Sequence, residues 1–146
     1  MTSKVKHVPE GFHTVSPYLV VQGASKLVDF LKQSFQATEF ERITQPDGMI
    51  MNAQLRIGDS VVMVSEARGG SKPMPASFYL YVPDTDAVYK SALQAGATSL
   101  MEPADQFYGN REAGVKDPFG NHWWIATHKE DVSLEEMQRQ ADNLFG

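Results

Sequence analysis

Cysteine is absent from this chain of 146 residues, and its absence excludes several kinds of chemistry. Without a thiol, the chain cannot form disulfides, use a thiolate nucleophile or hold a metal through thiolates. Long apolar runs are also absent, because none approaches the ~18 residues that a membrane-spanning helix needs. The first residues do not lead into the apolar stretch of a signal peptide. We therefore expect a cytoplasmic location and no membrane partner.

Positive charge is scarce as well. Lysine and arginine number 13 against 18 acidic residues, which gives a net charge of -5 at pH 7. This balance offers no electrostatic reason to bind nucleic acid, and it would weakly attract a cationic small molecule. No glycine-rich phosphate loop precedes a helix, and no serine nucleophile constellation emerges. The apolar content of 42% is typical of a globular domain with a hydrophobic core.

The sequence contains one pattern twice. Residues 18–23 return as residues 79–84 after 61 positions, and residues 57–65 return as residues 119–127 after 62 positions. A third match lies between them at an offset of 60. Near-equal offsets in one order indicate a duplicated unit. Two copies are too few for a solenoid, so we expect the two units to pair about a pseudo-two-fold axis.

Each copy is predicted to form a strand, a helix and three further strands. Apolar spacing and turn signals place these elements at residues 14–21, 24–35, 38–43, 49–57 and 60–65, and then at 77–82, 84–95, 98–101, 109–115 and 121–127. The predicted divisions are an N-terminal tail (1–12), a first module (13–66), a linker (67–76), a second module (77–128) and a C-terminal helix (129–146). The sequence leaves open whether the linker acts as a lid.

The C-terminal helix has a start signal of its own. Ser133-Leu-Glu-Glu136 has the spacing of a capping box. An apolar stripe then recurs at helical spacing: Leu134, Met137, Ala141 and Leu144. Such a stripe predicts docking, either on the protein's own body or on a partner subunit.

Alternation along the strands predicts two faces. In residues 49–57 the apolar side chains are expected under a helix: Met49, Met51, Ala53, Leu55 and Ile57. The polar Asn52, Gln54 and Arg56 would then face the opposite, concave side. Carried through the repeat, the same parity assigns ten more residues to that side: Ser16, Tyr18, Ser60, Val62, Val64, Ser77, Tyr79, Tyr81, His122 and Trp124. A single β-bulge would reverse any such assignment.

Four aromatic residues on this predicted face form the most suggestive cluster. Tyr18, Tyr79, Tyr81 and Trp124 would offer rings with polar tips, which suit a flat apolar or cationic small molecule. The same rings could instead fill a space that other proteins leave for a ligand.

Two histidines have different expected roles. His122 shares the predicted concave face with Trp124 and could hydrogen-bond a ligand or act as a general base. It could also be a polar residue at a strand end near solvent. His128 lies between the last strand and the capped helix, where a hydrogen bond in a turn is expected.

Arg111 and Tyr108 also leave alternatives open. Arg111 could clamp a ligand carboxylate or phosphate in bidentate fashion. It could equally pair with Asp117 or Asp105 and fix a strand hairpin. Tyr108 could line a pocket or serve the same hairpin.

The motif Asp117-Pro-Phe-Gly-Asn121 precedes the last predicted strand of two βαβββ units. This combination resembles the vicinal oxygen chelate superfamily of glyoxalases, extradiol dioxygenases and bleomycin-resistance proteins, over about residues 12–128. Residues 13–19, 105–111 and 124–133 resemble its PhnB-like branch. The resemblance implies an α+β fold in which two modules make a cupped eight-stranded surface, with an added C-terminal helix, and it implies a homodimer.

Metal-using members of that superfamily place a His, a Glu or Gln, a second His and a Glu on four equivalent strands, where they bind an octahedral divalent ion. The corresponding positions here hold Ser16, Val62, Ser77 and Trp124. None offers an imidazole or carboxylate donor, and the neighbouring Met63 and Trp123 are no better. We therefore expect no metal and no other cofactor.

The chain departs from the PhnB-like branch at one further point. Relatives usually read His-Ala-Glu where this chain reads Asn52-Ala53-Gln54. Both replacements are polar, but neither titrates, and both are poor metal ligands. This weakens any acid–base role for the strand.

Three functions remain in view. The leading hypothesis is a metal-independent protein that binds a small aromatic or amphipathic ligand through Tyr18, Asn52, Gln54, Tyr79, Tyr81, Tyr108, Arg111, His122 and Trp124. The second is a metal-independent enzyme in which His122 transfers protons with Tyr108, Arg111 or Tyr79. The third is a divalent-metal lyase or dioxygenase whose non-standard site draws on His122, Gln54 and Asn52.

Overall fold

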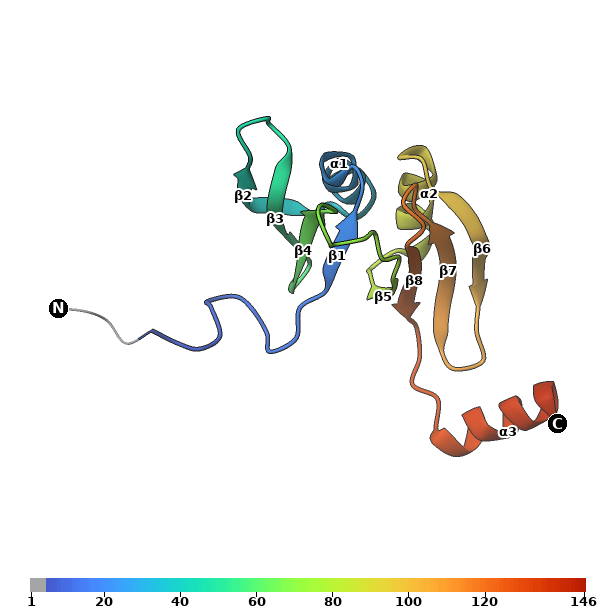
Figure 1. The fold of residues 1–146 in the computed structure, drawn as a ribbon. Helices are drawn as coiled ribbons and strands as arrows, with labels where there is room; N and C mark the ends of the chain where they lie inside the picture. The colour runs from blue at the N-terminus through green and yellow to red at the C-terminus, as the bar shows by residue number, and fades with distance from the viewer. Residues whose placement is uncertain (1–4) are drawn as a thin grey trace. The chain divides into compact units, whose positions relative to one another are not determined.

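The protein divides into two structural units, and the boundary between them along the chain lies between Ala76 and Ser77. The computed structural model describes residues 5–146; residues 1–4, part of the predicted N-terminal tail, lie outside it. Each unit contains one four-stranded mixed sheet and a helix that packs against it, and a third helix follows the second sheet (Figure 1). The predicted α+β class with two βαβββ modules and an added C-terminal helix is confirmed. The single cupped surface stays a prediction.

The first unit has its last strand next to its first. Its elements are β1 (Tyr18–Val21), α1 (Ala24–Phe35), β2 (Thr38–Thr44), β3 (Ile50–Ile57) and β4 (Ser60–Glu66). The strand order is β1-β4-β3-β2, with β1 parallel to β4. α1 lies against this sheet and buries Leu27 and Leu31 completely.

A buried glutamate starts α1. Gly23, the N-cap residue, has no side chain to cap the helix. Glu66 at the end of β4 takes over this role, because its carboxylate accepts the backbone N–H of Gly23 at 3.0 Å and of Ala24 at 2.9 Å. A negative charge is favourable at a helix N-terminus. Glu66 therefore ties the last strand of the unit to its helix.

The second unit repeats this plan. Its elements are β5 (Ser77–Tyr81), α2 (Thr85–Gln94), β6 (Thr98–Asp105), β7 (Asn110–Lys116) and β8 (His122–His128), in the order β5-β8-β7-β6. Asp84 caps α2 as predicted, since its carboxylate accepts the N–H of Ala87 at 3.1 Å. β5 and β8 are parallel, and β8 lies between β5 and β7.

α3 (Leu134–Phe145) begins where the capping signal predicts. The hydroxyl of Ser133 accepts the N–H of Glu136 at 3.1 Å. None of its residues is buried, and Leu134 and Phe145 are 78% and 84% exposed. Among the described residues, no helix is long and apolar enough to cross a membrane.

The predicted face of β4 is wrong. Val62 pairs with Leu55 and Val64 with Ala53, and all four side chains are buried on the side covered by α1. Ser60 has the same parity, at the exposed end of the strand. The residue of β4 that faces away from α1 beside Gln54 is Met63.

A difference in turn length explains this error. Met63 is the partner of Tyr18, and Trp124 is the partner of Tyr79, so the last strands of the units match at an offset of 61. The match of residues 57–65 with residues 119–127 in the sequence has an offset of 62 instead. The turn before β8 is longer than the turn at Gly58 before β4, and this difference shifted the predicted parity by one residue.

Two further expectations about strands are also wrong. The first strand begins at Tyr18, because Pro17 has no N–H for a ladder bond, so Ser16 precedes it. In β3, Ile50 is buried, while Met49 and Met51 are about half exposed. The register shifts between Ile43 and Thr44, opposite this point, and such a shift reverses the alternation.

The turn before β8 is organised by Asp117, which is almost fully buried. Its Oδ1 accepts the N–H groups of Phe119 at 2.8 Å and Asn121 at 3.0 Å. Its Oδ2 accepts the Asn121 amide at 2.9 Å and the Trp123 indole N–H at 2.8 Å. The Asp-Pro-x-Gly-Asn motif is therefore a structural device that fixes where β8 begins.

Replacing this aspartate should destabilise the protein strongly. We expect Asp117→Ala to lower the free energy of unfolding by about 2–4 kcal/mol, because four donors, three of them in buried hydrogen bonds, lose their acceptor. Urea unfolding would measure the loss. Asp59→Ala, at the exposed turn of the equivalent hairpin, is the matched control and should change stability by less than about 0.5 kcal/mol. Equal effects of the two variants would contradict this role of Asp117.

Candidate functional site

The face of the second sheet that points away from α2 carries the candidate site. Side chains on the α2 side, such as Trp123, Ile125 and Ala113, are buried. The strand register assigns the alternate residues to the opposite face, here called the open face: Ser77, Tyr79, Tyr81, Asn110, Glu112, Gly114, Lys116, His122, Trp124, Ala126 and His128.

Trp124 lies flat on the open face. Its strand partner on β7 is Gly114. A Cβ atom at position 114 would collide with the indole ring, since it would lie 2.6 Å from Cε3. The ring therefore rests on the backbone of β7 and stays partly exposed. Only glycine at position 114 permits this close approach.

Two tyrosines of β5 continue the aromatic surface. Tyr79 is 44% exposed and Tyr81 is 68% exposed. Their ring centroids are 5.3 Å apart, with the planes tilted by 57°. Because Tyr79 and Trp124 are partners in neighbouring strands, the open face presents three accessible rings side by side.

A buried carboxylate lies next to these rings. Glu112 of β7 is only 8% exposed. Its Oε1 accepts the hydroxyls of both Tyr79 and Tyr108, each at 2.5 Å. These are the short lengths of charge-assisted O–H···O bonds. The bond from Tyr79 crosses β8 at the small, fully buried Ala126, the partner of Glu112.

The network extends from Glu112 towards solvent. Asn110 donates from Nδ2 to the Tyr79 hydroxyl at 2.9 Å. Its Oδ1 lies 2.8 Å from Nδ1 of His128, and Nε2 of His128 lies 2.7 Å from Asp131. His128 thus makes the expected hydrogen bond in the turn, but it also fixes Asn110 within the network.

The network raises the pKa of both phenols. Burial is the main cause for Tyr79, and the hydrogen bond to Glu112 adds to it, so that its pKa rises to about 12 although Asn110 opposes the shift. Burial, and then the hydrogen bond to Glu112, also raise the pKa of Tyr108. Both phenols therefore stay protonated at neutral pH and act as donors to Glu112.

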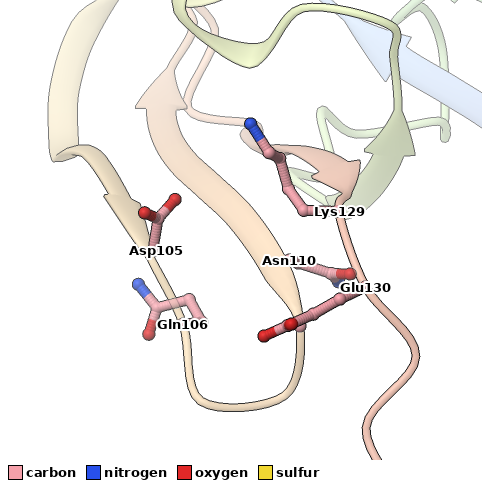
Figure 2. A pocket seen from close by; sticks show the side chains of 6 residues that line it. Asp105, Gln106, Asn110, Lys129 and Glu130 are labelled. Atoms are coloured by element: carbon pink, nitrogen blue, oxygen red, sulfur yellow. The ribbon is translucent and has the colours of Figure 1, made fainter.

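A small polar pocket adjoins the network at the β6–β7 hairpin (Figure 2). It has a volume of about 320 Å³ and is lined by Asp105, Gln106, Gly109, Asn110, Lys129 and Glu130. The carbonyl of Gly109 accepts the N–H groups of Lys129 and Glu130 at 2.9 and 3.2 Å. The segment that leaves β8 is thereby held against the hairpin, close to Asn110.

Arg111 lies on the α2 side of the sheet, away from the open face. It donates to Asp86 of α2 at 2.7 Å and to Asp105 of β6 at 3.2 Å. Both bonds raise the pKa of Arg111, the bond to Asp86 more than the bond to Asp105. Arg111 in turn lowers the pKa of Asp86. Arg111 therefore connects β7 to its neighbours.

His122 lies at the far end of β8 from the network. Its strand partners are Ser77 and Lys116. It lies four positions before Ala126, which is about 13 Å along a strand. The structure therefore does not bring His122 together with Tyr108 or Arg111. Tyr79, the third partner in the proton-transfer hypothesis, pairs with Trp124, two positions from His122 on the same face.

Tyr79 and Tyr108, both predicted site residues, do come together, but through Glu112. Glu112, Asn110 and the role of His128 were missed from the sequence. A signal existed, because Asn110, Glu112, Gly114 and Lys116 alternate with Arg111, Ala113 and Val115 along β7. This alternation places Glu112 on the face of Trp124.

In the first unit, the predicted site residues lie on the face away from α1. Tyr18 is 54% exposed, and it shares this face with Asn52, Gln54 and Met63. No charged network comparable to that of Glu112 links them within the described residues.

The donors do not fit the divalent metal site that the superfamily resemblance implies. Ser16 precedes β1, Val62 is buried under α1, and Ser77 and Trp124 lie on the open face. Within residues 5–146, no three histidine, aspartate or glutamate side chains cluster as metal ligands would. Hydroxyl, aliphatic and indole side chains at these positions would not hold such an ion.

The comparison of sequences identifies the family. A profile of the Glyoxalase/Bleomycin resistance protein/Dioxygenase superfamily matches residues 11–125, so the chain belongs to this superfamily. An uncharacterised protein of Mycobacterium bovis is 37% identical over 135 residues, which cover 85% of this chain and 89% of that protein. An uncharacterised protein of Mycobacterium tuberculosis has the same identity over 85% of this chain and 79% of its own length.

Solved structures share the fold. TioX from Micromonospora sp. ML1 has a TM-score of 0.64 at 22% identity, covering 78% of this chain and 98% of TioX. The PhnB protein from Bacillus cereus has a TM-score of 0.63 at 12% identity, covering 79% of this chain and 99% of that chain. These likenesses concern the fold alone.

The tyrosine network should make stability depend on alkaline pH. Raised phenol pKa values stabilise the folded state below the unfolded pKa of about 10. This stability is lost as the pH rises through the folded pKa, about 12 for Tyr79. We expect the free energy of unfolding to fall across this window, and to fall less in Tyr79→Phe. Urea unfolding at a series of pH values would test this.

Tyr89→Phe is the control, since Tyr89 bonds to Ser99 outside the network. It should show the pH dependence of the wild type. Identical pH profiles for Tyr79→Phe and the wild type would contradict the assignment.

Proposed function

We propose that the protein binds a small, flat aromatic ligand on the open face of its second sheet. The observation that carries this proposal is the Trp124 ring, which is held flat against Gly114 and left partly exposed beside Tyr79 and Tyr81. Aromatic rings on a surface without a covering helix favour stacking with a flat partner. Their position in neighbouring strands fixes them on a rigid element.

Binding is better supported than proton transfer. The phenols of Tyr79 and Tyr108 are held protonated by burial and by Glu112, so neither gives up a proton readily at neutral pH. His122 lies about 13 Å along β8 from Ala126, the strand partner of Glu112, to which both phenols donate. Arg111 is engaged by Asp86 and Asp105 on the other face.

We also propose that α3 mediates a homodimer. Its apolar stripe includes Leu134 and Leu144, which are 78% and 62% exposed, and no residue of α3 is buried. A single helix of 12 residues is marginal in water unless its apolar face packs. Packing against the same helix of a second copy would bury the stripe symmetrically.

Ligand binding can be tested with 2-naphthol and its saturated analogue decahydro-2-naphthol. We expect 2-naphthol to bind more tightly, because only the flat ring stacks, and to change the fluorescence of Trp124. Gly114→Ala should weaken binding roughly 2- to 13-fold, the loss of about 0.5–1.5 kcal/mol of stacking. Gly70→Ala, at a position with open space around it, is the control. Equal binding of both compounds would argue against a stacking site.

Dimer formation can be tested by sedimentation. We expect the wild type to be a dimer and Leu134→Glu/Leu144→Glu to be a monomer with unchanged circular dichroism of the two sheets, because charges would then interrupt the stripe. Glu135→Gln, exposed on α3 beside the stripe, is the control and should remain dimeric. A dimer that survives both leucine replacements would refute the proposed interface.

A further inference from the structure

We propose that the ligand of the open face is an organic cation, whose positively charged nitrogen pairs with Glu112 while its ring stacks on Trp124. This inference rests on the proposed function and extends it, because it assigns a charge class to the ligand. A heteroaromatic cation or an aryl ammonium ion would satisfy it. Four features of the site support it in turn: the charge of Glu112, its free oxygen, the rings beside it and its fixed position.

The first feature is that Glu112 is a buried carboxylate without a countercharge. It is 8% exposed. Its partners among the described residues are two phenols, and no lysine, arginine or histidine pairs with it. A buried charge is costly unless an opposite charge compensates it. Neutral phenols donate hydrogen bonds but supply no positive charge.

The second feature is that one oxygen of Glu112 is available. Both phenols bond to Oε1, and Oε2 has no partner within residues 5–146. Among residues 5–146, the fully buried side-chain nitrogen and oxygen atoms without a hydrogen-bond partner are Ser34 Oγ and Arg68 Nη1. Oε2 of Glu112 lacks a partner but is not one of them, so it is not fully sealed from solvent. An incoming N–H donor or cation can therefore reach it.

Two other buried carboxylates of the protein provide a comparison. In Glu66, both oxygens accept backbone N–H groups at the start of α1. In Asp117, both oxygens accept donors of its own turn. Glu112 differs from both, because one of its oxygens is left for a group outside the described chain.

The third feature is that aromatic faces lie beside this oxygen. Glu112 and Gly114 are successive residues on the open side of β7, about 7 Å apart, and the Trp124 ring covers Gly114. Tyr79, the strand partner of Trp124, reaches Glu112 from β5, across β8. A cation bound to Oε2 would therefore also contact ring faces, which attract positive charge.

The fourth feature is that the carboxylate is held in place before a ligand arrives. Tyr79 and Tyr108 fix Oε1, and Asn110 fixes the hydroxyl of Tyr79 at 2.9 Å. His128 in turn holds Asn110 at 2.8 Å. A carboxylate fixed in this way loses little conformational entropy on binding. The net charge of -5 would favour the approach of a cation and oppose that of an anion.

The test compares two probes of nearly equal shape: 1-methylquinolinium, which is permanently charged, and 4-methylquinoline, which is neutral at mildly alkaline pH. Calorimetric titration of the full-length protein would measure the affinity of each. We expect the cation to bind roughly tenfold more tightly or better. This preference should shrink as salt is added, because ions screen the charge pair.

Variants assign the preference to Glu112. Glu112→Gln keeps an oxygen acceptor for the phenols but removes the charge, so it should abolish the preference while 4-methylquinoline binds as before. Asp29→Asn removes the same charge from an exposed position of α1 and should leave the preference intact. If Glu112→Gln fails to fold, the comparison of the two probes in the wild type still decides whether a cation is preferred.

Each outcome has one meaning. A preference for the cation that Glu112→Gln removes supports the inference. Equal binding of both probes, or a preference that survives Glu112→Gln, overturns the inference but leaves the aromatic site standing. If neither probe binds and 2-naphthol also does not, the proposed function fails together with the inference.

Discussion

The parallel pairing of the first and last strands of each unit is the constraint from which the rest of the second unit follows. It places β8 between β5 and β7, so that residues distant in sequence meet on one face. Tyr79 precedes Glu112 by 33 residues, yet their side chains bond across β8. That bond needs a small residue beneath it, and Ala126 provides it. A larger side chain there would separate the phenol from the carboxylate.

The three buried acids of residues 5–146 show how carboxylates serve different structural roles. Glu66 and Asp117 have their oxygens saturated by the protein itself, and they fix the start of a helix and of a strand. Glu112 is only partly saturated and lies beside accessible rings. A half-satisfied polar group in a site otherwise built of fixed contacts is expected where a ligand completes the arrangement.

Membership of the superfamily explains the scaffold better than the chemistry. The duplicated βαβββ unit, the Asp117 turn and the strand order account for the fold. The positions to which the resemblance assigns metal ligands carry serine and tryptophan here, and methionine in β4 once its register is corrected from Val62 to Met63. In their place the second sheet presents rings and one carboxylate, from β5, β7 and β8. Function on this fold is therefore argued from the site, because one scaffold supports unrelated activities.

The sequence alone determined the duplication, the order of elements and the ends of most helices and strands, because apolar periodicity, turn residues and caps are local signals. It also placed Tyr79, Tyr81 and Trp124 on one face. It assigned Val62 to the wrong face because the turn before the last strand is longer in the second copy. A shift of one residue moves every side chain of a strand to the opposite face. Only the tertiary structure shows that Glu112 contacts Tyr79 and Tyr108, and that Arg111 binds Asp86 on the other face. These contacts depend on strand order and register, which set the distance between residues that no local pattern connects.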